Sequence, residues 1–293
     1  MNKNKQFSIT PVLDKLFRGD EKMPVGLYHL HLLTAAQLTK LHYSPGSYKT
    51  VRQRLKVLAD NGYVVIDAIP EKFTRGPNYY TLDTKGMQYL ASLGLEIDKS
   101  LRAGKETGKS YIHLRHLLEL NDVLIAALRV STLDPRLYVA EYVHERKLKR
   151  TPYTAMVRGL SYGLVPDGFI DFHVKREGQS DLRLPVLLEH DRGWERERQF
   201  KAKIAAYRAY IQNEAYKQQF GVGNITVIVT TFTNMERVAA LRKWTWDELA
   251  TDAVIAGRFR FGLLPRPPEP QHLLLDKRWY TLASDQPVAL LGE

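Results

Sequence analysis

The fold is decided by GLVPDGFIDFHV (residues 163–174) and LPVLLEHDRGW (residues 184–194), two apolar runs that carry carboxylates. Continuous apolar runs of this length predict strands that are covered on both faces of a sheet. Asp167 lies in the first run, and Glu189 and Asp191 end the second. A buried carboxylate without a partner costs on the order of several kcal/mol. A metal ion, an arginine or solvent must therefore satisfy Glu189 and Asp191.

Three polar residues follow on the helix that is predicted directly after the second run. In WERERQFKAKIAAYRAYIQNEAY (residues 194–216), Gln199, Lys203 and Tyr207 are spaced four apart, so they share one helix face. Tyr207 is expected to bury its ring. Carboxylates at the ends of neighbouring strands, with a lysine close by, predict a phosphodiester-cleaving site that depends on Mg²⁺ or Mn²⁺.

The candidate residues of this site have plainer alternatives. Asp167, Glu189 and Asp191 are the candidate metal ligands and catalytic carboxylates. Lys203 is the candidate catalytic lysine, which would position water or stabilise charge. Asp167 can also be an ordinary turn aspartate, and Glu189 and Asp191 can form a structural salt bridge with Arg192. Lys203 can also be a solvated helix residue.

Composition limits both the chemistry and the partners. The chain has 293 residues, of which 44% are hydrophobic and 26% charged, as in ordinary globular proteins with one or two domains. It has no cysteine, which excludes disulfides and thiolate metal sites. The polar N-terminus and the lack of an apolar run of about 18 residues favour a cytoplasmic protein with no membrane partner. The formal net charge of +11 indicates a polyanionic partner.

Residues 24–95 carry the pattern of a winged helix-turn-helix that binds double-stranded DNA. Thr34 is expected to cap the second of three helices. The third helix lies in SYKTVRQRLKVLADNG (residues 47–62), and a hairpin wing follows it. The candidate DNA-binding residues lie on the polar face of the third helix and at the tip of the wing: Lys49, Arg52, Gln53, Lys56, Lys72 and Arg75. A helical protein-interaction module with a solvated basic face is the alternative.

The rest of the sequence predicts a second, larger domain. A helix is expected at 111–131, strands at 137–145, 164–174, 182–190 and 224–232, a helix at 194–216, and an irregular stretch at 146–159. The predicted organisation is an N-terminal arm (1–23), the winged domain (24–95), a linker (96–110), this larger domain (111–262) and a C-terminal extension (263–293). The predicted fold class is α+β or α/β, with a mixed sheet flanked by helices.

The order helix, strand, strand, strand, helix, strand from Tyr111 to Phe232 resembles the core of the PD-(D/E)XK nuclease superfamily. The resemblance implies a restriction-endonuclease-like sheet and a divalent metal held by Asp167 and Glu189. That superfamily places a lysine two residues after the second acidic residue, where this chain has Asp191. Lys203 is the candidate for a migrated lysine, and loss of catalysis is the alternative.

Over nearly its whole length the chain resembles the replication-relaxation family of plasmid and mobile-element proteins. The resemblance rests on the winged segment, HLLELNDVLIAAL (residues 116–128), VPDGF (residues 165–169) and LLEHDRGWERERQFKAKIAAY (residues 187–207). It implies a role in replication and DNA relaxation of a mobile element. Besides duplex DNA, the expected partners are a second copy of the chain, in a homodimer, and replication or mobilisation proteins. A metal-dependent DNA-nicking endonuclease and a non-catalytic replication initiator or transcription regulator are the two functional hypotheses.

His29-Leu30-His31 matches the histidine pair of HUH relaxases, which also use a nucleophilic tyrosine. In those enzymes the pair lies on a strand. Here the sequence predicts a short helix at this position, which argues against a relaxase of that type.

Overall fold

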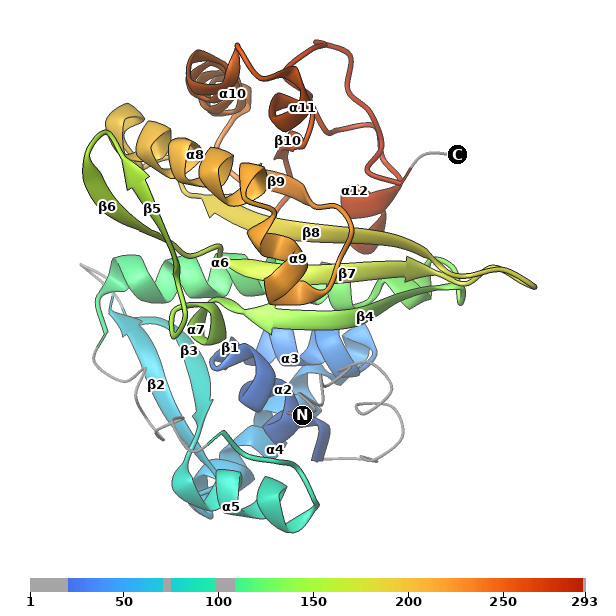
Figure 1. The fold of residues 1–293 in the computed structure, drawn as a ribbon. Helices are drawn as coiled ribbons and strands as arrows, with labels where there is room; N and C mark the ends of the chain where they lie inside the picture. The colour runs from blue at the N-terminus through green and yellow to red at the C-terminus, as the bar shows by residue number, and fades with distance from the viewer. Residues whose placement is uncertain (1–20, 71–74, 99–108, 292–293) are drawn as a thin grey trace. The chain divides into compact units, whose positions relative to one another are not determined.

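The computed structural model describes residues 21–70, 75–98 and 109–291. The chain divides into two compact units between Leu128 and Arg129, and each is described here by itself (Figure 1). Both units combine helices with β-sheet. Within the described residues, no helix is both long enough and apolar enough to span a bilayer.

The N-terminal unit consists of helices and a small antiparallel sheet, as predicted. Its helices are α2 (Lys22–Leu30), α3 (Ala35–His42), α4 (Tyr48–Asp60), α5 (Thr84–Ser92) and α6 (Tyr111–Leu128), with a 3₁₀ turn at Pro45–Ser47. Its strands are β1 (Leu33–Thr34), β2 (Val64–Pro70) and β3 (Arg75–Leu82), and they pair in the order β1-β3-β2.

Capping and side-chain patterning explain how α3 and α4 form. The Thr34 hydroxyl accepts a hydrogen bond from the Gln37 amide at 3.2 Å, which confirms the predicted cap. Val51 and Leu55 of α4 are buried, at the spacing that the sequence pattern requires. After α4, Gly62 has a φ of +74°, a conformation that favours glycine and turns the chain into β2.

Helix α6 packs within the N-terminal unit. Asn121 Nδ2 donates to the carbonyl oxygens of Leu30 and Leu32 at 3.1 and 2.7 Å. Gln37 Nε2 donates to the Leu118 carbonyl at 2.7 Å. The boundary between the two compact units falls after α6. The sequence predicts that the helix at 111–131 belongs to the larger domain. A broad apolar stripe predicts a buried helix but does not say which core buries it.

The C-terminal unit is built on a mixed sheet of five strands in the order β10-β9-β8-β7-β4. The strands are β4 (Leu137–His144), β7 (Gly168–Val174), β8 (Leu182–Asp191), β9 (Thr226–Thr231) and β10 (Phe259–Leu263). β7 pairs antiparallel with both β4 and β8, and β9 pairs parallel with both β8 and β10. The strands predicted from the apolar runs are thus confirmed.

Helices cover this sheet and close its core. They are α7 (Glu145–Leu148), α8 (Glu197–Gln212), α9 (Ala215–Phe220), α10 (Met235–Leu249), α11 (Ala253–Ala256) and α12 (Pro270–Leu274), with a 3₁₀ turn at Val130–Thr132. The core packs Phe169 and Leu187 of the sheet against Phe200 and Tyr207 of α8. Beyond the last strand, Trp279 is fully buried, so the C-terminal extension is packed.

A hairpin occupies much of the stretch that the sequence predicted to be irregular. It consists of β5 (Tyr153–Val157) and β6 (Leu160–Leu164), which pair with each other only. The two residues between them, Arg158 and Gly159, have φ values of +51° and +78°. Two consecutive positive φ values are typical of tight hairpin turns. Asparagine or aspartate usually stands where this chain has Arg158, so the turn signal was missed.

Candidate functional site

The register of β7 and β8 brings Asp167 and Glu189 to the same edge of the sheet. Gly168 pairs with Leu188, so the residue before β7 lies beside the end of β8. The Asp167 amide donates to the Leu188 carbonyl at 3.0 Å, and Asp167 Oδ2 accepts a hydrogen bond from the His190 amide at 2.7 Å. Asp167 and Glu189 are both buried, with 8% and 4% of their surface exposed.

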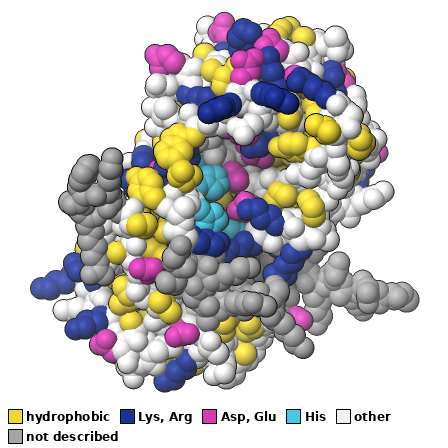
Figure 2. All heavy atoms as spheres, turned by 90° about the vertical axis from the view of Figure 1, so that its left-hand side faces the viewer, with side chains coloured by type: hydrophobic (Ala, Val, Ile, Leu, Met, Phe, Trp, Pro, Cys, Tyr) yellow, Lys and Arg dark blue, Asp and Glu magenta, His cyan; other side chains and the backbone are white. Residues whose placement is uncertain are grey.

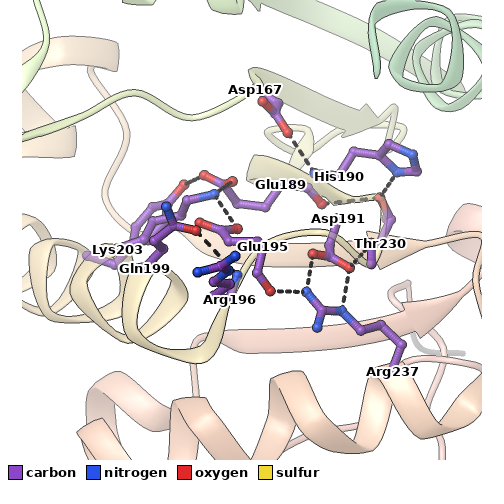
Figure 3. Close-up of polar contacts among 12 residues, drawn as sticks. Asp167, Glu189, His190, Asp191, Glu195, Arg196, Gln199, Lys203, Thr230 and Arg237 are labelled. Carbon is purple, nitrogen blue, oxygen red and sulfur yellow. Dashed lines mark hydrogen bonds and ion pairs between the residues drawn. The ribbon is translucent and has the colours of Figure 1, made fainter. Parts of the chain in front are cut away.

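Helix α8 brings a lysine and a tyrosine to Glu189. Lys203 Nζ donates to Glu189 Oε2 at 2.9 Å (Figure 3). The Tyr207 hydroxyl donates to Glu189 Oε1 at 2.6 Å. The four-residue spacing predicted that these side chains share a helix face, and both reach the same carboxylate. Gln199 begins the same row but is exposed, and its Oε1 accepts a hydrogen bond from the Arg196 amide at 3.4 Å.

Burial and neighbouring charges shift the pKa values in this group. Burial raises the pKa of Glu189 to about 7, with Lys203 lowering it and Asp167 raising it. Burial alone would lower the pKa of Lys203, but Glu189, Glu195 and Asp167 more than offset this effect. The lysine pKa is therefore raised well above its usual value. Lys203 stays charged at neutral pH, while Glu189 is close to its titration point.

Asp191 lies apart from this group and forms a structural ion pair. Arg237 of α10 binds it with two hydrogen bonds, from Nε to Oδ2 at 2.7 Å and from Nη2 to Oδ1 at 2.6 Å. The Gly193 amide also donates to Asp191 Oδ2 at 2.7 Å. A bidentate arginine holds a carboxylate in a fixed orientation. Of the three predicted carboxylates, only Asp167 and Glu189 come together with Lys203.

Two residues of the site were missed in the sequence. Glu195 Oε2 lies 3.1 Å from Lys203 Nζ, so this lysine bridges two glutamates. Arg237 fixes Asp191, a role for which the sequence suggested Arg192. Glu195 could have been found from its position eight residues before Lys203, close to the start of α8. Arg237 gave no signal, because its contact with Asp191 spans 46 residues of chain.

A cation could be held by Asp167 and Glu189. The described residues contain no group of three or more histidine or acidic side chains placed to hold a metal. Two carboxylates are nevertheless enough for Mg²⁺, which keeps several waters and takes further ligands from phosphate. Asp167 raises the pKa of Glu189 by repulsion between the two charges, and a bound cation would offset that repulsion. The chemistry of this pair therefore fits a divalent ion.

In the N-terminal unit, α4 displays the predicted basic face. Lys49, Arg52, Gln53 and Lys56 are all exposed, on the side opposite to Val51 and Leu55. Arg52 also lies over the ring of Tyr48, with 5.8 Å between its Cζ atom and the ring centroid.

Three further predicted positions bear on the N-terminal unit. Lys72 and the side chain of Arg75 lie outside the described residues. His29 lies in helix α2, as predicted, and not on the strand that the relaxase motif requires.

Comparison with known proteins identifies a family. The model of the replication-relaxation family matches residues 26–228, which run from α2 to β9 and include Asp167, Glu189, Lys203 and Tyr207. No curated protein and no solved structure gives a match. The chain belongs to the replication-relaxation family.

Proposed function

We propose that this chain acts in the replication or relaxation of a plasmid or mobile element as a metal-dependent DNA-nicking endonuclease. The observation that carries the proposal is the position of Lys203 Nζ, 2.9 Å from Glu189 Oε2 and within the electrostatic reach of Asp167. The strand itself has no lysine two residues after Glu189. Helix α8 supplies one to the same carboxylate, as a migrated nuclease lysine would require.

The N-terminal unit supports a role in reading duplex DNA. Its sequence of α2, α3, α4 and the β2–β3 hairpin is the element order of a winged helix-turn-helix. In that arrangement α4 would enter the major groove. Its exposed cationic and amide side chains are of the kind that contact phosphates and base edges.

The sheet of the C-terminal unit supports a PD-(D/E)XK-like site. Asp167 immediately precedes β7, Glu189 lies near the end of β8, and Lys203 comes from the helix that follows. Asp167 and Glu189 would hold Mg²⁺ or Mn²⁺, which supplies charge stabilisation at the scissile phosphate and a more acidic water. Tyr207 and Lys203 each bind one oxygen of Glu189, and so fix the orientation of its carboxylate.

Nicking of supercoiled plasmid in the presence of Mg²⁺ or Mn²⁺ tests the proposal. Asp167→Asn and Glu189→Gln are expected to abolish nicking and to leave duplex binding intact. The matched control is Asp171→Asn. Asp171 is another buried carboxylate on β7, but it binds Arg183 Nη2 at 2.6 Å, away from Lys203. Unchanged nicking by both site variants would sink the catalytic assignment.

A non-catalytic replication initiator or transcription regulator is the second candidate. It is favoured by the hydrogen bonds to both oxygens of Glu189 and by the ion pair of Asp191, which stands where the superfamily has its lysine. Wild-type protein that binds duplex DNA but shows neither nicking nor calorimetric heat with Mg²⁺ would support this candidate. Metal-dependent nicking would exclude it.

A further inference from the structure

The turn between β8 and α8 carries an exposed tryptophan next to the Glu189 site. Trp194 has 56% of its surface exposed. The next residue, Glu195, binds Lys203, which in turn binds Glu189. β8 runs toward the left in Figure 1, and Figure 2 views the molecule from that side. Apolar and basic side chains are both exposed at the surface in this view (Figure 2).

The backbone is anchored on both sides of Trp194. Arg237 holds Asp191 before the turn, and its Nη2 also donates to the Glu195 carbonyl at 2.8 Å after it. Gly193 has a φ of +82°, and a Cβ there would lie 3.2 Å from the Thr233 hydroxyl oxygen. The backbone of the turn therefore has little freedom, and it carries an indole that is not packed into the core.

Arginines lie on both sides of Trp194 in the chain, and one of them contacts its ring. Arg192 Cζ lies 4.9 Å from the centroid of the Trp194 ring. Arg196 and Arg198 are exposed where the turn leads into α8. Glu195 and Glu197 form ion pairs with lysines of α8. From Arg192 to Lys203 the chain carries five cationic side chains and two glutamates, and this positive balance suits the backbone of a nucleic acid.

We propose that Trp194 is a stacking platform for an unpaired base, so that the neighbouring site receives single-stranded or locally melted DNA. An accessible aromatic ring beside cations is the combination found in sites that bind single strands without sequence preference. Inside a duplex each base is covered by its neighbours and offers no face to such a ring. The inference rests on the proposed function, because it names the form of DNA that reaches the site.

Binding of a labelled oligo(dT) of about 12 nucleotides tests this role. Trp194→Ala is expected to weaken binding about tenfold, which corresponds to about 1.4 kcal/mol. Trp194→Phe should bind as the wild type does, because it keeps an aromatic face. Trp246→Ala is the matched control, since Trp246 is also exposed, at 48%, but lies on α10. A labelled duplex of the same length should bind all variants equally.

Tryptophan emission provides an independent measurement. Oligo(dT) should quench the wild-type emission, and Trp194→Phe should lose this quenching while it still binds. Several results would overturn the platform. Trp194→Ala could bind oligo(dT) as tightly as the wild type, or lose the same affinity for the duplex as for oligo(dT). Trp246→Ala could lose as much affinity for oligo(dT) as Trp194→Ala, or Trp194→Phe could keep the wild-type quenching.

The nicking assay separates this inference from the proposed function. If Trp194 proves to bind oligo(dT) but the wild type does not nick plasmid, the cleavage proposal fails and the platform stands. If the wild type nicks plasmid and Trp194→Ala keeps full affinity for oligo(dT), the platform fails and the cleavage proposal stands.

Discussion

Replacement of Lys203 by methionine tests the centre of the site most directly. The change keeps the length of the side chain but leaves Glu189 buried beside Asp167 without a positive charge. Loss of one partner of a buried ion pair costs about 3–5 kcal/mol. The Lys203 side chain is 21% exposed, so water can reach the position and the lower end of that range applies. We expect the free energy of unfolding to fall by about 3 kcal/mol at pH 8.

The loss should depend on pH with a definite sign. Without Lys203 the pKa of Glu189 rises further above 7, so the folded variant keeps a proton that the unfolded chain releases above about 4.5. The loss of stability relative to the wild type is therefore largest at pH 8. It is small below about pH 4.5, where Glu189 is neutral in the wild type and in Lys203→Met. A second change, Glu189→Gln in the Lys203→Met background, should restore part of the stability at pH 8.

Urea unfolding followed by circular dichroism at several pH values measures these differences. Lys201→Met is the matched control. Lys201 lies on the same helix with 18% of its side chain exposed, but its partners Glu197 and Asp247 are 51% and 30% exposed. Exposed pairs contribute little to stability, because water and salt screen them. A loss in Lys203→Met that is no larger than in Lys201→Met and does not change with pH would refute the reasoning. Lys203 would then be an ordinary solvated helix lysine.

Two further outcomes are expected. In the wild type, the raised pKa of Glu189 should make the free energy of unfolding fall by about 3 kcal/mol as the pH rises from about 4.5 through about 7. Urea midpoints measured over this pH range test the prediction. If the midpoint of Glu189→Gln changes with pH as much as that of the wild type, the prediction is wrong. Joint replacement of Arg52 and Lys56 by alanine should weaken duplex binding about tenfold and reduce the salt slope by about 1 for each phosphate that is no longer neutralised. Fluorescence anisotropy titrations at several salt concentrations measure both effects. Arg136→Ala is the control, because Arg136 is also an exposed arginine. Equal affinity of the double variant and the wild type would count against α4 as the DNA-reading helix.

Local patterns predict the strands and the helix that carry the candidate site. The apolar runs around Asp167 and Glu189 indicated β7 and β8, and the four-residue spacing of Lys203 and Tyr207 placed both on one face of α8. Each of these predictions depends only on the period of a single element. Because α8 comes directly after β8 in the chain, this helix face could also be expected to lie close to Glu189.

Contacts between distant segments could not be predicted in this way. Arg237 binds Asp191 across 46 residues, and nothing near either residue indicates the other. The sequence therefore predicts either a metal ligand or a salt bridge at Asp191, since a strand pattern shows that a charge is buried but not what neutralises it. For a similar reason the sequence does not assign α6 to the N-terminal unit. Asn121 donates hydrogen bonds to the carbonyls of Leu30 and Leu32, about 90 residues earlier in the chain, and no local pattern indicates this contact.

Arg237 also bears on how the molecule can be divided. The family match ends at residue 228, before α10 begins at Met235. The guanidinium that fixes both ends of the β8–α8 turn is therefore supplied from outside the segment that defines the family. A fragment trimmed to the matched residues would keep Asp167, Glu189 and Lys203 and yet lose the clamp on the adjacent turn. The matched segment therefore ends inside the C-terminal unit, and a comparison at this turn also needs the residues of α10.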